Sequence, residues 1–312
     1  MSGLLVVGDV VTDVVARYRA PLAAATDTAA DIRTLPGGAG ANAACWAARA
    51  GCADVRLLAR VGTDRADWHE ESLRRAGVRP LLVRDPEAPT ATVIALVDRD
   101  DGERTFLTES GAALRLSSGD WPPDALDGVA RLHLSGYLFF APTSAEAART
   151  ALASADERGV PVSVDPASAG FLARLGRDRF LTAVEGVELL LPNAHEAALL
   201  TGLPAPEAAA AALSRRFPLV AVTLGGGGAL VAEGGRVVAK AAAPPVRVVD
   251  TTGAGDAFTG AFLAARLAGA GPAAAAEAGC RAGAEAVTRT GGRPPPGQGA
   301  SPRDGNPRDG NP

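Results

Sequence analysis

Short runs of aliphatic and β-branched residues alternate along this chain with alanine-rich stretches of helical character. The runs are LLVVGDV, VRLLARVG, RLHLSGYLFF, PVSVDPA, VELLLPN, LVAVTLGGGG and VRVVD, and the stretches between them include NAACWAARAG and PAPEAAAAALSRRF. Continuous apolar runs are typical of parallel strands that are buried on both faces. The alternation therefore predicts an α/β fold in which a mostly parallel central sheet is covered by helices on both sides.

Polar residues gather where these runs end. They are Asp9, Asp13, Asp165, Asn193, the glycines from Gly225 onward, and Asp250. Parallel sheets of this kind bind ligands at the carboxyl ends of their strands. We therefore expect the ligand site at that edge, although Asp9 could equally cap a helix or shape a turn.

The stretch TATVIALVDRDDGERTFLT, residues 90–108, interrupts the alternation. It is typical of two strands joined by a polar turn around Asp101 and Gly102. Together with the extended stretch after Asp13, it predicts a small β-sheet lid over one end of the main sheet, formed from about residues 10–35 and 88–110. Val93, Ala95 and Val97 would form an apolar face that needs cover, which favours a homodimer through the lid.

Composition and charge exclude several classes of protein. The chain has 312 residues, 47% of them hydrophobic, which is enough for a substantial core. Its net charge of −4 argues against nucleic-acid partners and anionic membranes. No apolar run approaches the roughly 20 residues of a membrane span, and Gly8 and two aspartates interrupt the N-terminal run, so we expect a cytoplasmic protein.

The lysine and cysteine residues exclude further classes of enzyme and site. Lys240 is the only lysine among 31 basic residues, and it lies in neither a Walker A loop nor a protein-kinase strand, which both require one. Cys45, Cys52 and Cys280 form no CxxC pair, which argues against disulfides and zinc. We expect them to be small buried hydrophobic residues.

The stretch VVDTTGAGDAFTGAF, residues 248–262, combines a glycine loop with an aspartate at the start of a helical pattern. Asp256 is expected in the first turn of that helix, where unpaired amide groups form a site for an anion such as phosphate. A carboxylate there can accept a proton from a hydroxyl group that attacks phosphorus. Aspartate is also favoured in any first turn by the helix dipole alone, which is the purely structural alternative.

DTTGAGDAFTGAF resembles the C-terminal signature of the ribokinase or PfkB family of sugar and nucleoside kinases. PGGAGANAACWAARAG, residues 36–51, is similar to the N-terminal glycine motif of that family, and LARVGTDRADWHEESLRRAGV follows its pattern. The resemblance implies a ribokinase-like three-layer α/β/α sandwich with a β-sheet lid, in one kinase domain over residues 1–295. It also implies transfer of the γ-phosphoryl group of ATP to a hydroxyl of a small sugar or sugar acid.

The resemblance implies roles for individual residues. Asp256 would be the catalytic base, and the loop Gly253, Ala254 and Gly255 would supply, with the amide of Asp256, the anion hole. Substrate would be bound by Asp13, Gly37, Gly38 and Asn42. The nucleotide would be bound by Asn193, Thr223, Gly225, Gly228 and Thr252.

Metal sites are implied in the same way. Glu196 would act on Mg²⁺ through water, as part of an NxxE element with Asn193. Asp250, Thr252, Ala286, Arg289 and Gly291 occupy the positions that help bind K⁺ in some members. ATP and Mg²⁺ are therefore the expected cofactors, with K⁺ as a further candidate.

Two alternatives to a sugar kinase remain at this stage. Phe106, Tyr137, Phe139 and Phe140 could stack on a nucleobase, which would make the chain an adenosine- or pseudouridine-like nucleoside kinase, or they could simply pack in the core. Ala39 stands where ribokinase-like members often have lysine, and ESGAALRL lacks an asparagine found in several sugar kinases, so ribose is not implied. A non-catalytic metabolite-binding protein on the same scaffold is the other alternative.

Proline, glycine, aspartate and asparagine dominate from Arg293 onward, and PRDGN occurs twice in tandem. Such a composition cannot bury a core. It predicts a disordered tail over residues 296–312 with no catalytic role.

Overall fold

The computed structural model describes residues 3–19, 22–98 and 104–295. Its main sheet has nine strands in these residues, in the order β13-β12-β11-β10-β9-β8-β1-β4-β5. The parallel strands are β1 (Gly3–Val7), β4 (Val55–Gly62), β5 (Val78–Asp85), β8 (Val129–Ser135), β9 (Val162–Asp165), β10 (Leu189–Leu190) and β11 (Leu219–Thr223). The antiparallel strands β12 (Ala229–Glu233) and β13 (Arg236–Ala241) extend one edge.

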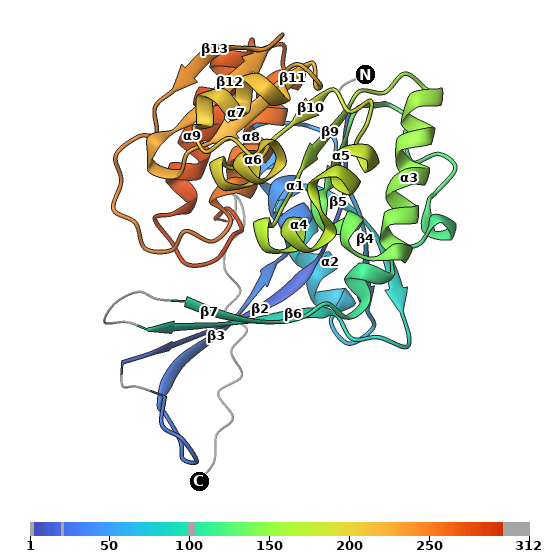
Figure 1. Ribbon diagram of the computed structural model, residues 1–312. Coiled ribbons are helices and arrows are strands. Elements are labelled where there is room, and N and C mark those ends of the chain that lie inside the picture. Colours follow the sequence, from blue (N-terminus) through green and yellow to red (C-terminus); the bar gives the residue numbers. More distant parts are fainter. Residues whose placement is uncertain (1–2, 20–21, 99–103, 296–312) are drawn as a thin grey trace.

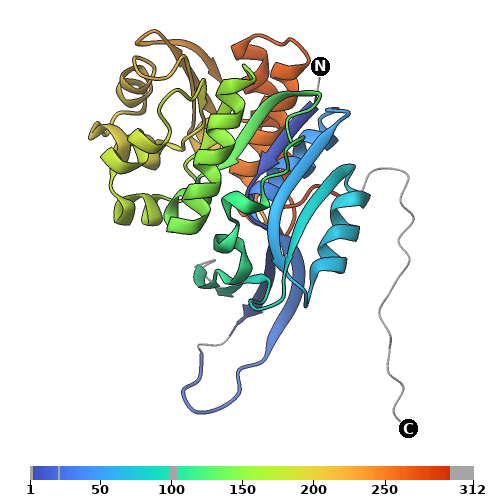
Figure 2. The ribbon, with the colours of Figure 1, turned by 90° about the vertical axis from the view of Figure 1, so that its right-hand side faces the viewer.

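Helices cover both faces of this sheet, which confirms the three-layer prediction (Figures 1 and 2). One layer holds α1 (Ala39–Arg49), α2 (Ala66–Arg75), α8 (Ala254–Leu267) and α9 (Pro272–Ala286), and the other holds α3 (Pro142–Glu157), α4 (Ala169–Leu175), α5 (Arg177–Ala183), α6 (Ala194–Thr201) and α7 (Pro206–Leu213). Successive residues of β1 point to opposite layers: Leu4 packs in the same cluster as Phe262, and Leu5 in the same cluster as Phe180.

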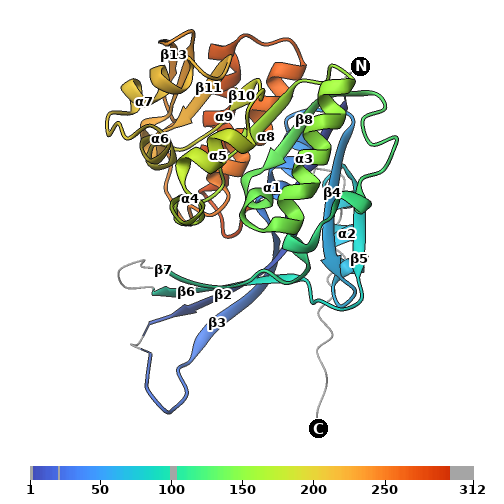
Figure 3. The same ribbon diagram turned by 45° about the vertical axis from the view of Figure 1, so that its right-hand side comes forward.

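A second sheet of four strands projects from the body (Figures 1 and 3). Its order is β3 (Ala30–Gly37), β2 (Val11–Tyr18), β6 (Ala91–Asp98) and β7 (Arg104–Glu109). The antiparallel pairing of β6 with β7 confirms the predicted hairpin, and β2 and β3 supply the rest of the lid. The predicted turn around Asp101 and Gly102 lies outside the described residues.

The two faces of the lid differ from the expectation. Val93 lines a cavity beneath the lid and Ala95 is buried, so the predicted apolar face turns toward the body. The opposite face carries alternating apolar residues of all four strands: Val14, Ile32, Ile94, Leu96 and Leu107. On that face Ile32 is 63% exposed and Leu107 is 54% exposed, so it is this outer face that lacks cover.

Two strand predictions are wrong. VRVVD, Val246–Asp250, is not a strand but part of an irregular connection between β13 and α8, in which Val248 is 57% exposed. Pro244 and Pro245 precede it and cannot donate ladder hydrogen bonds, so the sheet ends at β13. In RLHLSGYLFF only the first part forms β8, because the chain turns into a 3₁₀ helix over Gly136–Phe140.

Several smaller expectations can be compared with the structure. The three cysteines are free thiols, of which Cys45 and Cys280 are buried as predicted and Cys52 is half-buried. Lys240 lies on β13, where its exposed amine pairs with Glu207 of α7 at 3.0 Å. Among the described residues no helix is both long and apolar enough to cross a bilayer. The predicted tail, residues 296–312, lies outside them.

Candidate active site

The glycine loop leads into helix α8 as predicted. The helix begins at Ala254 with Asp256 in its first turn, and Gly253 precedes it in the left-handed conformation, with a φ of 75°. A Cβ atom on Gly253 would lie 2.3 Å from the Cα atom of Gly292, so the close approach of two backbones requires glycine at this position. The loop is thus held in place by the segment that follows α9.

A cavity of about 190 Å³ opens at the N-terminus of α8. Its lining combines the loop with polar residues from the ends of neighbouring strands: Asp165, Asn193, Glu196, Thr223, Thr251, Gly253, Ala254, Gly255, Asp256 and Thr259. The amides of a first helical turn lack acceptors within the helix and carry the positive end of its dipole. This cavity is therefore suited to an anion the size of a phosphate group.

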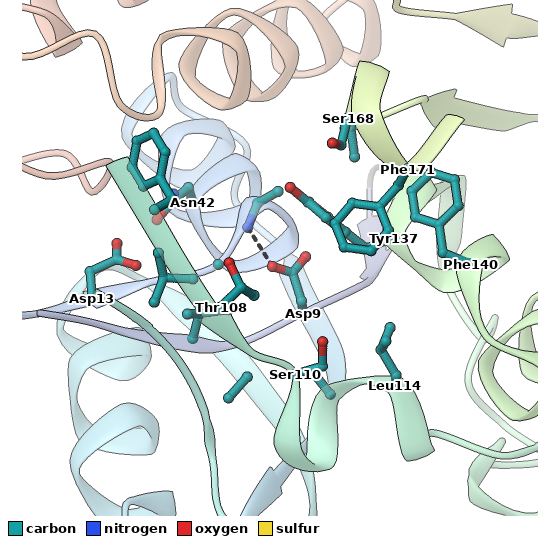
Figure 4. Close-up of a pocket in the computed structure, with 18 of the residues that line it drawn as sticks. Asp9, Asp13, Asn42, Thr108, Ser110, Leu114, Tyr137, Phe140, Ser168 and Phe171 are labelled. Carbon is teal, nitrogen blue, oxygen red and sulfur yellow. Dashed lines mark hydrogen bonds between the residues drawn. The ribbon is translucent and has the colours of Figure 1, made fainter. Parts of the chain in front are cut away.

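A larger cavity of about 450 Å³ lies between the lid and the body (Figure 4). Lid residues such as Val11 and Asp13 form one wall, and Gly38 and Asn42 at the start of α1 form another. Asp256 lines both this cavity and the smaller one. Its carboxylate therefore stands where a molecule in the larger cavity would meet an anion in the smaller one.

Asn42 and Asp9 organise the junction between the two cavities. Asn42, buried on α1, donates from Nδ2 to Asp256 Oδ2 at 2.8 Å. Asp9 accepts a hydrogen bond, drawn in Figure 4, from the backbone N–H group of Ala39 at 2.9 Å. It also accepts from the backbone N–H group of Gly40 at 3.1 Å and from the Ser135 hydroxyl at 3.2 Å. Asp9 therefore satisfies the first amides of helix α1 from outside the helix, and it also lines the larger cavity.

Several carboxylates share this region, and their crowding changes their acidity. Burial raises the pKa of Asp256 well above its usual range, and the nearby Asp165, Asp9 and Asp13 raise it further, against the hydrogen bond from Asn42. Burial and Asp9 raise the pKa of Asp13 to about 7, against the positive charge of Arg293. A raised pKa makes Asp256 a stronger base once it is ionised.

The NxxE element forms a reciprocal cap on α6. The Asn193 side chain accepts from the Glu196 N–H at 2.9 Å, and Glu196 accepts from the Asn193 N–H at 2.9 Å. Burial and the proximity of Asp165 raise the pKa of Glu196, so Asp165 and Glu196, which line the smaller cavity together with Asp256, compete for ionisation. Among the described residues no group of three or more His, Cys, Asp or Glu side chains could hold a metal ion directly. The two acids fit a cation that keeps part of its water shell.

The other predicted nucleotide positions lie along one strand and its turn. Thr223, at the end of β11, lines the smaller cavity and pairs with Asn193 in an isolated bridge. Gly225 and Gly228 lie farther along, where a 3₁₀ turn over Gly225–Gly227 connects β11 with β12. Thr252 lines the larger cavity.

The positions predicted for K⁺ converge only in part. Asp250 accepts from the N–H groups of Thr252 at 2.9 Å and Gly291 at 3.1 Å, so it ties the glycine loop to the segment after α9. Ala286 ends α9, and its carbonyl accepts from the Arg289 N–H at 3.3 Å.

Comparison with known proteins decides the family. The profile of the pfkB family of carbohydrate kinases matches residues 1–297. The chain belongs to this family. It is 33% identical over 239 residues to a cytidine kinase of Thermococcus kodakarensis, covering 74% of this chain and 80% of the relative. It is 34% identical over 242 residues to a fructokinase of Klebsiella pneumoniae, covering 73% and 76%.

The fold of this pfkB-family chain is shared with solved structures. A putative ribokinase II from E. coli, in complex with ATP and Mg²⁺, superposes with a TM-score of 0.83 at 25% identity, over 94% of each chain. The agreement confirms the ribokinase-like fold expected from the two glycine motifs.

Aromatic residues form the wall of the larger cavity in this pfkB-family chain. Phe171 of α4 stacks on Phe140 with ring centroids 5.2 Å apart, and its ring meets the edge of Tyr137 at 5.7 Å. Phe106 of the lid lines the same cavity, whereas Phe139 packs against Phe180 in the core. Phe171 was missed, because SAGFLARL is typical of any amphipathic helix and carries no sign of a cavity.

Arg293 is a second residue that the sequence did not indicate. It lies just where the composition becomes rich in proline and glycine, yet its side chain donates to Asn42 Oδ1 at 3.2 Å and to the Gly37 carbonyl at 3.2 Å. These contacts lie within the predicted kinase domain, residues 1–295, but the composition around Arg293 gave no sign of them.

Proposed function

We propose that this chain transfers the γ-phosphoryl group of ATP to a hydroxyl group of a neutral, ribose-containing molecule or small sugar, with Asp256 as the general base. The observation that carries the proposal is the position of Asp256, whose carboxylate lines both cavities beside the first-turn amides of α8. Substrate would occupy the larger cavity and the phosphates of ATP the smaller one.

In the reaction, Asp256 takes the proton of the substrate hydroxyl, the hydroxyl oxygen bonds to the γ-phosphorus, and the bond to ADP breaks. Ala254, Gly255 and Asp256 line the smaller cavity, where the first-turn amides would stabilise the charge of the migrating group; the Ala254 N–H also donates to the Thr251 carbonyl at 3.4 Å. On the substrate side, Asp13 can accept hydrogen bonds from two adjacent hydroxyls, and Gly38 would let the substrate approach the backbone, whereas Gly37 leaves room for the Asp13 carboxyl group.

ATP and Mg²⁺ are the proposed cofactors. Asn193, Thr223 and Glu196 would hold the nucleotide phosphates and, through water, Mg²⁺, which neutralises phosphate charge when bound. K⁺ remains a proposal on Asp250, Thr252 and Gly291, whose hydrogen bonds connect the glycine loop to the last segment. The expected cytoplasmic location also stays a prediction.

The charge of the larger cavity argues for an uncharged substrate. Its described lining contains four acidic residues, Asp9, Asp13, Glu109 and Asp256, and no lysine, arginine or histidine. A carboxylate on the substrate would meet repulsion there, and the nearby cation described in the structure, the guanidinium of Arg293, is already bonded to Asn42, Gly37 and Cys45. A sugar acid, one of the substrates expected from the sequence, is therefore disfavoured.

The size and the aromatic wall of the cavity favour a nucleoside over a free sugar. Its 450 Å³ falls in the range of roughly 300–1,000 Å³ typical of pockets for drug-sized ligands. Tyr137, Phe140 and Phe171 lie on the side away from Asp13 and Asn42 (Figure 4). A ribose at Asp13 and Asn42 would leave its base to stack on these rings. The relationship to a cytidine kinase supports this order, and that to a fructokinase keeps a free sugar as the second candidate.

A substrate panel tests the assignment. With Mg-ATP, we expect kcat/KM for cytidine or adenosine to exceed that for ribose and fructose. Phe171→Ala should lower kcat/KM for the nucleoside by about 10- to 100-fold, because base stacking is worth about 1–3 kcal/mol, and should leave any activity on ribose unchanged. Phosphorylation of sugars but of no nucleoside would contradict the substrate class and leave the kinase intact. Calorimetric binding without ATP consumption would favour the non-catalytic alternative.

The outer face of the lid supports the proposed homodimer. Ile32 and Leu107 are its most exposed apolar residues, and a second lid would remove them from water. We expect light scattering to give a mass near that of two chains, and the double variant Ile32→Lys/Leu107→Lys to give one. The matched control, Leu203→Lys/Val238→Lys, places the same charges on exposed apolar residues outside the lid and should keep the larger mass. A wild-type monomer at micromolar concentration would contradict the dimer.

A further inference from the structure

The segment that follows α9 crosses the edge of the active site. Arg17 of the lid donates to Thr290 Oγ1 at 2.9 Å, and Trp46 Nε1 of α1 donates to the Gly292 carbonyl at 2.8 Å. A Cβ atom on Gly292 would lie 2.3 Å from Asn42 Nδ2, so the segment can approach Asn42 this closely only because it has glycine there. The residue that comes next, Arg293, is thereby brought beside the side chain that contacts the proposed base.

The Arg293 guanidinium is held by three acceptors. Its Nε donates to Asn42 Oδ1 at 3.2 Å, its Nη2 to the Gly37 carbonyl at 3.2 Å, and its Nη1 to Cys45 Sγ at 3.4 Å. Because arginine carries only donors, the amide oxygen of Asn42 must face it. The amide nitrogen of Asn42 must then point the other way, where it donates to Asp256 Oδ2 at 2.8 Å.

We propose that Arg293 is a positioning residue that fixes Asn42 as a hydrogen-bond donor to Asp256 and so favours the ionised form of the base. If the Asn42 amide were reversed, its oxygen could be bonded only by a protonated Asp256, which cannot accept the substrate proton. Arg293 prevents this reversal by occupying the oxygen. The inference rests on the proposed function, because it concerns how the same base is kept ready.

The acidic groups around Asp256 explain why a fixed hydrogen-bond donor to its carboxylate is useful. The ionisable groups that face it come from five elements: Asp9 after β1, Asp13 on β2, Asp165 at the end of β9, Tyr137 after β8, and Glu196 on α6. Three of these carboxylates raise the pKa of Asp256, as burial does, and the hydrogen bond from Asn42 is the contribution that lowers it. Loss of that donor would leave more of the base protonated at neutral pH.

Two neutral replacements of Arg293 separate the hydrogen bond from the charge. The Nε2 atom of glutamine is as many bonds from Cα as the Nε of arginine, so Arg293→Gln can still donate to Asn42 Oδ1. Arg293→Met has similar length and no donor. We measure kcat/KM against pH and compare the acid limb, the pH range in which activity falls on the acid side. In Arg293→Met this limb should lie about one pH unit higher than in the wild type. The shift corresponds to a loss of about tenfold in kcat/KM at lower pH, which recovers at high pH. Arg293→Gln should lie closer to the wild type.

Two further variants test whether the effect passes through Asn42. Arg17→Met removes another tie of the same segment without touching Asn42, and its acid limb should coincide with that of the wild type. In an Asn42→Ala background, Arg293→Met should lower kcat/KM by less than about twofold more, because the effects of two residues that act through the same contact are not additive. Thermal unfolding checks that each variant is folded, and Arg293→Ala replaces Arg293→Met if the latter is not.

Three outcomes would overturn the inference. The acid limbs of Arg293→Gln and Arg293→Met could coincide, or the acid limb of Arg17→Met could move as far as that of Arg293→Met. In the third, the losses of kcat/KM caused by Arg293→Met and Asn42→Ala would be additive. An inactive wild type would instead contradict the proposed function. An active wild type with an unmoved acid limb in Arg293→Met would contradict only the role of Arg293.

Discussion

Replacement of Asp256 by asparagine is expected to lower kcat by about 10²- to 10⁴-fold, the range of general-base catalysis. Asparagine keeps the size of the side chain and can still bond to Asn42, but it cannot take a proton from the substrate. KM for ATP should change little, because the amides of the glycine loop remain. Steady-state kinetics with the best substrate of the panel would measure both quantities.

Asp178 supplies a matched control for that variant. It is also an aspartate in the first turn of a helix, α5, but its side chain is exposed and lines neither of the two cavities. Asp178→Asn should therefore change kcat less than about twofold, whatever the helix dipole contributes to stability. If Asp256→Asn retained comparable activity, Asp256 would have only the structural role of a first-turn acid.

The second large effect is expected for Gly253→Ala. Alanine must adopt a φ of 75° there and place its Cβ 2.3 Å from Gly292, so the loop has to move. Movement of the amide groups that face the phosphoryl group should lower kcat by about 10²- to 10³-fold, as the loss of an oxyanion-hole donor does. Because the displaced loop also contacts the last segment, the variant should be less stable in thermal unfolding.

A glycine at the other end of α8 allows the effect of backbone strain to be measured without a steric clash. Gly269 follows α8 with a φ of 89°, and its added Cβ would meet nothing within 4 Å. Gly269→Ala therefore carries backbone strain without a clash, and we expect some loss of stability with kcat unchanged. Equal activity losses in the two variants would mean that the geometry of the glycine loop is not what supports the reaction.

Local sequence patterns predicted the parts of this molecule that depend on neighbours in the chain. Buried parallel strands leave continuous apolar runs, and a first-turn aspartate after a glycine loop is a short motif, so the sheet and Asp256 could both be found. VRVVD has the composition of a strand, but strand formation also needs a partner, and no described strand pairs with it. Composition alone could not reveal that.

The contacts that complete the site join residues far apart in sequence. Arg293 reaches Asn42 across 251 positions, and Asn42 reaches Asp256 across 214. Phe171 becomes part of a cavity wall only when α4 packs beside the turn that carries Phe140. Without information on these long-range contacts, nothing in the sequence indicated that Arg293 contacts Asn42 or that Phe171 lines a cavity.

Lys240 has a practical consequence for studying this chain. Its amine is exposed on edge strand β13, at the end of the body opposite the lid (Figure 1), and it is the only side-chain amine in the sequence. Reagents that acylate amines would attach there and at the α-amino group alone. A fluorophore or a sensor-chip linkage on Lys240 would thus leave the catalytic cleft unobstructed and hold every molecule in a nearly uniform orientation.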